Sequence, residues 1–208
     1  MLERFIIVVG VAALGLVGCD NGGGGSDAGS DAGPPIMIPD AGESACAPPT
    51  GGFGTSEGRN FLPFTLNRCD GTEFSFYSEA DGYCEASYTV VSVAAGWCGP
   101  CRTEAGLMQE FLVERYASYG VRVVVAIIEN NERGVAPDVA LCNDWVSRYG
   151  LTNPVMLDPA QETQVYFPAG ALPATLIVDS NGVIVHREYG VSTDLETVRA
   201  QLDSLLGL

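Results

Sequence analysis

The sequence predicts a domain of the α/β class, in which helices pack on a central β-sheet. Two continuous runs of apolar and β-branched residues, 88–94 and 121–128, are typical of strands buried on both faces of a sheet. Each run is followed by a segment whose apolar residues recur at helical spacing. Residues 174–179 and 183–189 flank Ser180-Asn181-Gly182, which is typical of a β-hairpin. Strand, helix, strand, helix, hairpin and a closing helix together indicate an α/β layer fold.

Composition excludes several classes of function. The chain has 208 residues, with 26 Asp and Glu against 10 Lys and Arg, and a formal net charge of −16. All the basic residues are arginine, so no lysine is available for a Schiff base. The single histidine, His186, excludes sites built from several histidines, and we expect it to be structural. Without a basic cluster the chain lacks the electrostatic footprint of a nucleic-acid-binding protein, and we expect no nucleic-acid partner.

The N-terminus has the features of a bacterial lipoprotein signal peptide, expected over residues 1–18. Residues 5–17 are apolar, too short a stretch for a membrane span of about 20 residues but suited to the core of a secretory signal. Leu16-Val17-Gly18-Cys19 resembles the lipobox, which implies cleavage before Cys19 and acylation of that cysteine. Acyl chains would anchor the protein in a membrane outside the cytoplasm, inner or outer. An ordinary signal peptide with a chance cysteine is the alternative.

Residues 19–60 are expected to be a flexible tether that carries the lipidated cysteine. Residues 20–60 contain 11 Gly and 5 Pro, and they include Gly22-Gly23-Gly24-Gly25-Ser26. Such a segment cannot bury enough apolar surface to offset the entropy lost on ordering. We therefore expect the folded domain over residues 61–208.

The remaining elements follow in order along this domain. Short strands are expected over 61–66 and 73–77, as an N-terminal β-hairpin. The helix after the 88–94 strand is marked by five apolar residues at helical spacing: Leu107, Met108, Phe111, Leu112 and Tyr116. A second helix is expected over 138–149, and a final one opened by Thr193 or Asp194 as N-cap.

Trp97-Cys98-Gly99-Pro100-Cys101 lies between the 88–94 strand and the following helix. A thiol at a helix N-terminus faces unpaired backbone N–H groups and the positive end of the helix dipole, so its pKa falls. Cys98 is therefore the expected exposed nucleophile, and Cys101, one turn further in, resolves a mixed disulfide. A stabilising disulfide without turnover is the alternative. Zinc would need a second ligand pair that the sequence lacks, so we expect no metal and no cofactor.

This motif after a buried strand resembles the thioredoxin superfamily, specifically its extracytoplasmic TlpA/ResA-like branch, over the whole of residues 61–208. The resemblance implies a thioredoxin-like fold: a central mixed sheet flanked by helices, with an N-terminal β-hairpin extension and an inserted helix. It implies that Leu172 and a cis-Pro173 lie beside the disulfide and, with Trp97, contact the substrate. It also implies that Glu104, three residues after Cys101, moves a proton, because a buried carboxyl has a raised pKa.

The chain departs from the family pattern at three places. Ser92 stands where thioredoxins carry a buried aspartate, so the proton-accepting role passes to Glu104. Gly106 replaces the proline of the helix, where it can still bend the chain. Residues 81–87, which include Cys84, replace the usual Gly-Lys before the first buried strand. None of these changes removes the redox pair.

Four further cysteines are expected to form structural disulfides: Cys46, Cys69, Cys84 and Cys142. They allow three pairings, and spacing alone does not choose among them. The pairing we favour joins Cys69 to Cys84 across the 73–77 strand, which leaves Cys46 for Cys142. An oxidising compartment makes such bridges expected, and a second redox relay is the alternative.

The sequence therefore leads to the hypothesis of a lipid-anchored thiol–disulfide oxidoreductase. The Gly-Pro pair between the cysteines matches that of the reducing thioredoxins, whose reduction potential is about −270 mV. Strong oxidants have a reduction potential of about −120 mV. The expected substrates are disulfides of exported proteins, with apocytochrome c as one candidate, and a membrane electron donor is required. Two rivals remain. A thiol peroxidase is disfavoured because Val91 and Ala95 occupy the positions of the proline and threonine of peroxiredoxins. A non-catalytic thioredoxin-fold binding lipoprotein is the other.

Overall fold

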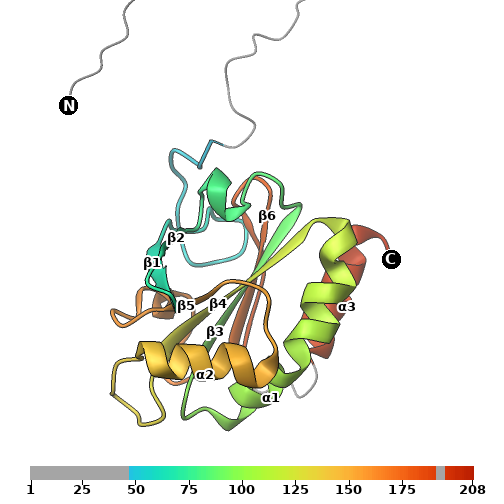
Figure 1. The fold of residues 1–208 in the computed structure, drawn as a ribbon. Coiled ribbons are helices and arrows are strands. Elements are labelled where there is room, and N and C mark those ends of the chain that lie inside the picture. Colours follow the sequence, from blue (N-terminus) through green and yellow to red (C-terminus); the bar gives the residue numbers. More distant parts are fainter. Residues whose placement is uncertain (1–46, 191–194) are drawn as a thin grey trace, which may run out of the picture. The chain divides into compact units, whose positions relative to one another are not determined.

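A computed structural model describes residues 47–190 and 195–208 (Figure 1). The strands of this part are β1 (Thr65–Arg68), β2 (Glu73–Ser75), β3 (Tyr88–Ala95), β4 (Val121–Glu129), β5 (Val155–Leu157), β6 (Ala174–Asp179) and β7 (Ile184–Tyr189). The α-helices are α1 (Gly99–Met108), α2 (Val139–Tyr149) and α3 (Glu196–Leu206). A π-helical stretch, Gln109–Glu114, continues α1, and short 3-10 helices cover Glu79–Asp81, Ala117–Tyr119 and Glu162–Tyr166.

Within the described residues the strands form one mixed sheet, in the order β2-β1-β5-β4-β3-β6-β7. β3, β4 and β5 run parallel, whereas β6 is antiparallel to β3, and β7 to β6. β1 pairs antiparallel with both β2 and β5. The expected mixed sheet with an N-terminal hairpin extension is therefore confirmed, as is the inserted helix, which is α2.

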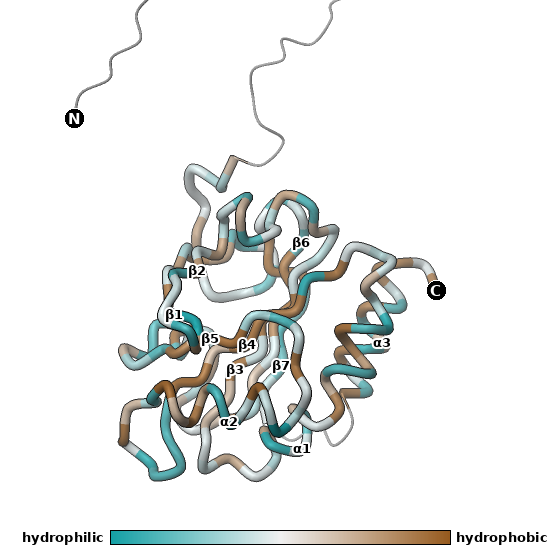
Figure 2. Tube along the Cα trace, in the orientation of Figure 1, coloured by the Kyte–Doolittle hydropathy of each residue, from teal (hydrophilic) through white to brown (hydrophobic). Residues whose placement is uncertain are grey.

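The centre of the sheet is the core of the domain. Val91 in β3 and Val124 in β4 are fully buried, as the continuous apolar runs predict. Figure 2 shows hydrophobic residues gathered along these central strands, with hydrophilic ones on the outer loops and helix faces. In Figure 1 α1 and α3 lie together at one side of the view, and both Arg115 and Tyr116 hydrogen bond to Asp203 of α3.

The N-terminal extension differs from the expected strand over 61–66. β1 begins only at Thr65, because Phe61 and Phe64 turn into an aromatic cluster instead of extending the sheet. The Arg122 guanidinium of β4 lies 4.9 Å from the centre of the Phe76 ring in this cluster. It also donates to the Phe76 and Asp81 carbonyls, at 3.1 and 2.9 Å. One half-buried cation thus fastens the extension to the central sheet.

Chain contacts with the domain begin before the expected boundary at Phe61. The backbone N–H of Gly58 donates to the Ile184 carbonyl at 2.8 Å, and the Ile184 N–H donates to the Arg59 carbonyl at 2.9 Å. Glu57 accepts from the backbone N–H of Arg187 at 3.0 Å. The last residues of the expected tether therefore pair with β7.

Several expectations lie outside the described residues: the signal peptide, Cys19, the tether as far as Cys46, and the N-cap at Thr193 or Asp194. In the part of the chain that the structure describes, no helix has the length and apolar composition required to cross a bilayer.

Candidate active site

The two motif cysteines lie where β3 passes into α1. Cys98 is the N-cap of α1, and its Sγ accepts a hydrogen bond from the backbone N–H of Cys101 at 3.2 Å. Pro100 occupies the first turn, where a missing N–H costs nothing because that group has no helical partner. Cys98 and Cys101 form a disulfide, with their Cα atoms 5.2 Å apart. The helix N-terminus predicted from the motif is therefore present.

Cys98 is not exposed in this oxidised state, contrary to the expectation. Both motif cysteines are only 2% exposed. The cause is the capping geometry: the Cys98 sulfur folds back over the first turn of α1, where it bonds to Cys101 and packs into the hydrophobic core. A partner thiol must therefore approach through a local opening or a movement of the covering groups.

Trp97 is held by contacts with the end of β4 and the loop that follows it. Its Nε1–H donates to Glu129, which ends β4 beside Ala95 of β3. Glu129 also accepts from Gln161 at 3.3 Å. The Arg133 guanidinium lies 3.6 Å from the centre of the indole ring, within the range of a cation–π contact. Sequence reasoning did not single out Glu129, although its place at the end of a buried strand is a usable signal.

The turn before Trp97 requires glycine. A Cβ at Gly96 would lie 2.7 Å from the carbonyl carbon of Asn130 and 2.8 Å from the nitrogen of Asn131. Arg102 donates both to the Gly96 carbonyl and to the Asn131 side chain. The loop after β4 is thereby fixed against the motif.

The peptide bond between Leu172 and Pro173 is cis, as expected from the resemblance. Both residues are buried. Pro173 immediately precedes β6, whose first residue, Ala174, lies opposite Val93 of β3. Since β3 leads directly into the motif, the sheet register brings Pro173 to the active-site end of the sheet. Ser92, the replacement for the thioredoxin aspartate, is buried beside Thr175 of β6.

Glu104 is a buried carboxyl one helical turn after Cys101. It is 2% exposed, and its Oε2 has no hydrogen-bond partner among the described residues. Burial, and secondly the nearby Glu188, raise the pKa of Glu104 to about 8. Residues three apart on a helix are neighbours on one face, so the Glu104 carboxyl is on the side of Cys101. The expected burial is confirmed, and the proton-accepting role stays a prediction.

A cavity of about 200 Å³ lies beside Glu104. Its other lining residues are Pro173, Thr175, Glu188, Tyr189, Gly190 and Thr197. The cavity therefore joins the carboxyl of α1 to the residue of the cis bond and to the end of β7. Glu188 was not among the residues singled out from the sequence.

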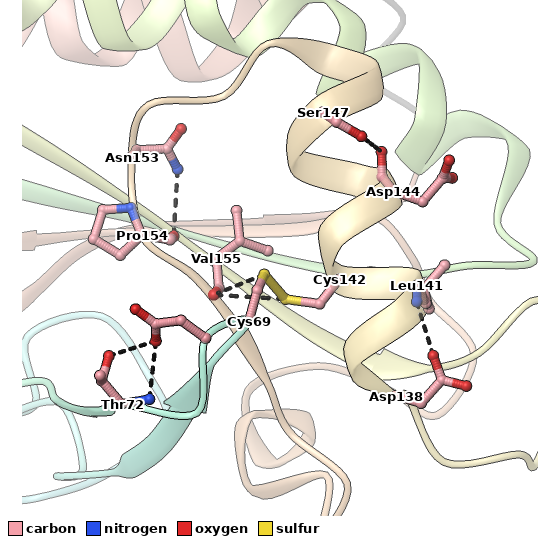
Figure 3. The surroundings of a disulfide bond; sticks show 11 residues. Cys69, Thr72, Asp138, Leu141, Cys142, Asp144, Ser147, Asn153, Pro154 and Val155 are labelled. Carbon is pink, nitrogen blue, oxygen red and sulfur yellow. Dashed lines mark hydrogen bonds between the residues drawn. A yellow bond between two sulfur atoms is a disulfide. The ribbon is translucent and has the colours of Figure 1, made fainter.

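The structural disulfide differs from the favoured pairing. Cys69 is bonded to Cys142, with their Cα atoms 5.3 Å apart, and not to Cys84 (Figure 3). The reason is the sheet order: β1 pairs with β5, and α2 packs over β5, so the end of β1 meets the side of α2. Cys84 also takes part in a disulfide, and Cys46 lies outside the described residues.

Comparisons with known proteins agree with this arrangement. The thiol-disulfide oxidoreductase ResA of Bacillus thuringiensis is 31% identical over 97 residues, which are 47% of this chain and 51% of that protein. The chain thus spans about half the length of the ResA proteins that it matches.

Two solved structures show the same fold. A DsbE-type thiol:disulfide interchange protein from Chlorobium tepidum has a TM-score of 0.59 at 20% identity, over 74% of this chain and 100% of that one. StoA from Bacillus subtilis has a TM-score of 0.51 at 20% identity, over 68% of this chain and 96% of that one. The expected thioredoxin-like fold is thereby confirmed. The family model described as Redoxin matches residues 57–203. The chain belongs to the Redoxin family.

Proposed function

We propose that this protein is a thiol–disulfide oxidoreductase that exchanges electrons with protein disulfides through Cys98 and Cys101. One observation carries the proposal: the two cysteines cap the N-terminus of α1, and Cys98 Sγ accepts the Cys101 N–H. The likeness to ResA over 97 residues supports it.

The reaction proceeds by two exchanges. The thiolate of Cys98, favoured by the N–H group and the helix dipole, attacks one sulfur of a partner disulfide and releases the other as a thiolate. Cys101 then loses its proton to Glu104 and attacks Cys98 Sγ, which frees the second partner sulfur. The partner disulfide gains two electrons and leaves as two thiolates, which take their protons from water, and the Cys98–Cys101 disulfide forms.

The walls of the site provide the docking surface for the partner. Trp97, Leu172 and Pro173 contact the substrate chain in this proposal. Trp97 is suited to the role because Glu129 and Arg133 fix its ring in one orientation, so little side-chain entropy is lost on binding.

The protein acts as a reductant in the cell envelope, held by lipid on Cys19 at the outer face of the inner membrane or at the outer membrane. The lipobox-like Leu16-Val17-Gly18-Cys19 supports the anchor, and the Gly-Pro pair between the cysteines supports the reducing direction. Its substrates are disulfides of exported proteins, including apocytochrome c. A membrane electron donor returns the pair to the dithiol.

One observation favours a second candidate, a binding lipoprotein without turnover: Cys98 is only 2% exposed. Replacing Cys98 with Ser separates the two, because it abolishes an oxidoreductase function and spares a binding one.

The reduction potential of the Cys98–Cys101 pair tests the proposal. The full chain is equilibrated across defined ratios of oxidised and reduced dithiothreitol, and the peptide with both cysteines is followed by mass spectrometry. A reversible two-electron titration near or below about −270 mV is expected. A reduction potential of about −120 mV would refute the reducing direction and with it the reduction of apocytochrome c. A pair that does not titrate would refute the oxidoreductase function itself.

A further inference from the structure

We propose that Glu188 is a positioning residue that links Glu104 to solvent and carries away the proton released by Cys101. The inference rests on the proposed function, since it concerns the same dithiol reaction. It assigns a second carboxyl to that chemistry, on a strand at the edge of the sheet.

Two hollows in the structure meet at Glu188. The inner one is the cavity of about 200 Å³ that Glu104 lines. The outer one is a groove of about 590 Å³, open to solvent, between β7 and the chain that precedes the domain; it is lined by Ser56, Glu57, Arg187, Glu188 and Tyr189. Only Glu188 and Tyr189 line both hollows among the residues described. Of these two, Glu188 is the one with a carboxyl group.

The inner cavity suits proton transfer. A volume of about 200 Å³ has room for several water molecules, and a water needs polar groups around it. Glu104 and Glu188 offer carboxyl oxygens, and Thr175 and Thr197 offer hydroxyl groups. The Oε2 atom of Glu104 has no partner among the described residues, so it is available to a water in the cavity.

The charged groups around Glu188 come from three parts of the chain. Glu104 faces it from α1, and Glu57 and Arg187 border the outer groove. On β7 itself, His186 Nε2 lies 3.5 Å from Glu188 Oε2. The lining residues from β6 and α3, Thr175 and Thr197, are neutral. Glu104 is therefore the like charge across the cavity, and His186 is the neighbouring ring on β7 itself.

The proton balance of the step is simple. When Cys101 Sγ attacks Cys98 Sγ, its proton moves to the Glu104 carboxylate, and the two electrons of the new S–S bond come from the thiolate. Two neighbouring carboxylates repel each other, and the charge of Glu188 contributes to the raised pKa of Glu104, so in this proposal the proton passes from Glu104 toward Glu188 through the cavity. Glu188 then releases that proton to water in the outer groove, and Glu104 is ready for the next cycle.

The isosteric variant Glu188→Gln tests this role through the pH profile. The rate at which the reduced full chain cleaves a model protein disulfide is measured from pH 5 to pH 9. With the like charge removed, Glu104 ionises more readily. The acid limb of the pH–rate profile therefore moves to lower pH by about half a pH unit or more, which is an approximately threefold change in the proton affinity of Glu104. Glu110→Gln is the matched control: it removes the same charge from an exposed position on the helix that continues α1, and leaves the limb in place.

Two further variants distinguish the effect of the Glu188 charge from other causes of a shift. Glu188→Asp retains the charge, so its acid limb stays close to that of the unmodified protein, which a loss of packing alone would not achieve. In a Glu104→Gln background, Glu188→Gln causes no additional shift, because the group through which it acts is gone.

A shift that persists without Glu104, or a Glu188→Gln profile equal to that of Glu110→Gln, would overturn the role of Glu188. Neither result contradicts the proposed oxidoreductase function. That function fails only if the unmodified chain cleaves no disulfide.

Discussion

Cys69 and Cys142 place their bonded sulfur atoms against one backbone carbonyl. Their sulfur atoms lie 3.7 and 3.8 Å from the carbonyl oxygen of Val155 in β5, as Figure 3 shows. The disulfide therefore joins the turn after β1, the side of α2 and the strand between them at a single point. It fastens the N-terminal extension to the inserted helix, the two additions that distinguish this domain from a minimal thioredoxin-like sheet.

Loss of this bridge is expected to destabilise the domain. Its cysteines are 73 residues apart, and closing a loop of that length restricts the unfolded chain by about 4 kcal/mol. The double variant Cys69→Ser/Cys142→Ser should therefore lose about that free energy of unfolding, measured by guanidinium denaturation. The matched control, Cys98→Ser/Cys101→Ser, opens a loop of only 3 residues and should lose clearly less. Equal losses would contradict the prediction.

Cys101→Ser should trap a mixed disulfide between Cys98 and a partner protein. Without the resolving thiol, the second exchange cannot occur and the intermediate accumulates. Non-reducing electrophoresis followed by mass spectrometry of the linked peptides measures it. Cys98→Ser is the control and should trap nothing; trapping through Cys101 in that variant would show that the roles of the two cysteines are reversed.

Glu104→Gln should change how stability depends on pH. The pKa of Glu104 is raised from 4.5 to about 8 in the folded protein, so the neutral carboxyl favours folding. Its contribution is fully present below pH 4.5 and is lost as the pH rises through 8. The variant stays neutral, so its melting temperature should exceed that of the unmodified protein by about 4 °C or more at pH 9.

Thermal unfolding at pH 5, 7 and 9 provides the measurement for Glu104. Glu110→Gln should follow the unmodified protein at each pH. A constant difference between the Glu104→Gln and unmodified proteins across this range would contradict a titration of Glu104.

Two glycines near the active site should respond to alanine in opposite ways. At Gly96 the new Cβ would meet backbone atoms of Asn130 and Asn131 at 2.7–2.9 Å, which cannot move aside, so Gly96→Ala should cost about 1–3 kcal/mol. At Gly106, inside α1, the nearest atom is Tyr149 Cδ1 at 3.9 Å, an ordinary contact. Gly106→Ala should stabilise the protein by up to about 1 kcal/mol, because alanine favours the helix. Urea denaturation of both variants tests the difference in sign.

Long strands could be predicted from the sequence more closely than short ones: β2 lies within the expected 73–77, but β1 is displaced from the expected 61–66. β3, β4 and β6 are runs of six or more residues rich in valine and isoleucine, and each appears within a residue or two of the expected bounds. β5 has only 3 residues between prolines, too few for a periodic pattern. Because β1 pairs with β5, the absence of β5 from the prediction also hid the contact between Cys69 and Cys142.

The site residues could be predicted where they lie close to one another along the chain. Cys98, Cys101 and Glu104 follow one another along a single helix, and the cis bond before Pro173 follows from the resemblance. Glu188 was missed because an acidic residue in an edge strand resembles a solvated one. Alternation along β7 gives no signal for it, because the register with β6 shifts between the pairs Val178–Ile184 and Ile177–His186. The structure places Glu188 opposite Thr175 of β6, and both line the cavity beside Glu104.

The pairing of residues 58–59 with β7 also bears on solubility. An edge strand presents unpaired N–H and C=O groups that can recruit a second chain into the sheet. Here both backbone groups of Ile184 are bonded to Gly58 and Arg59, and the Arg187 N–H is bonded to Glu57. The chain thereby occupies its own sheet edge, which blocks intermolecular β-pairing at these positions and protects the domain against aggregation.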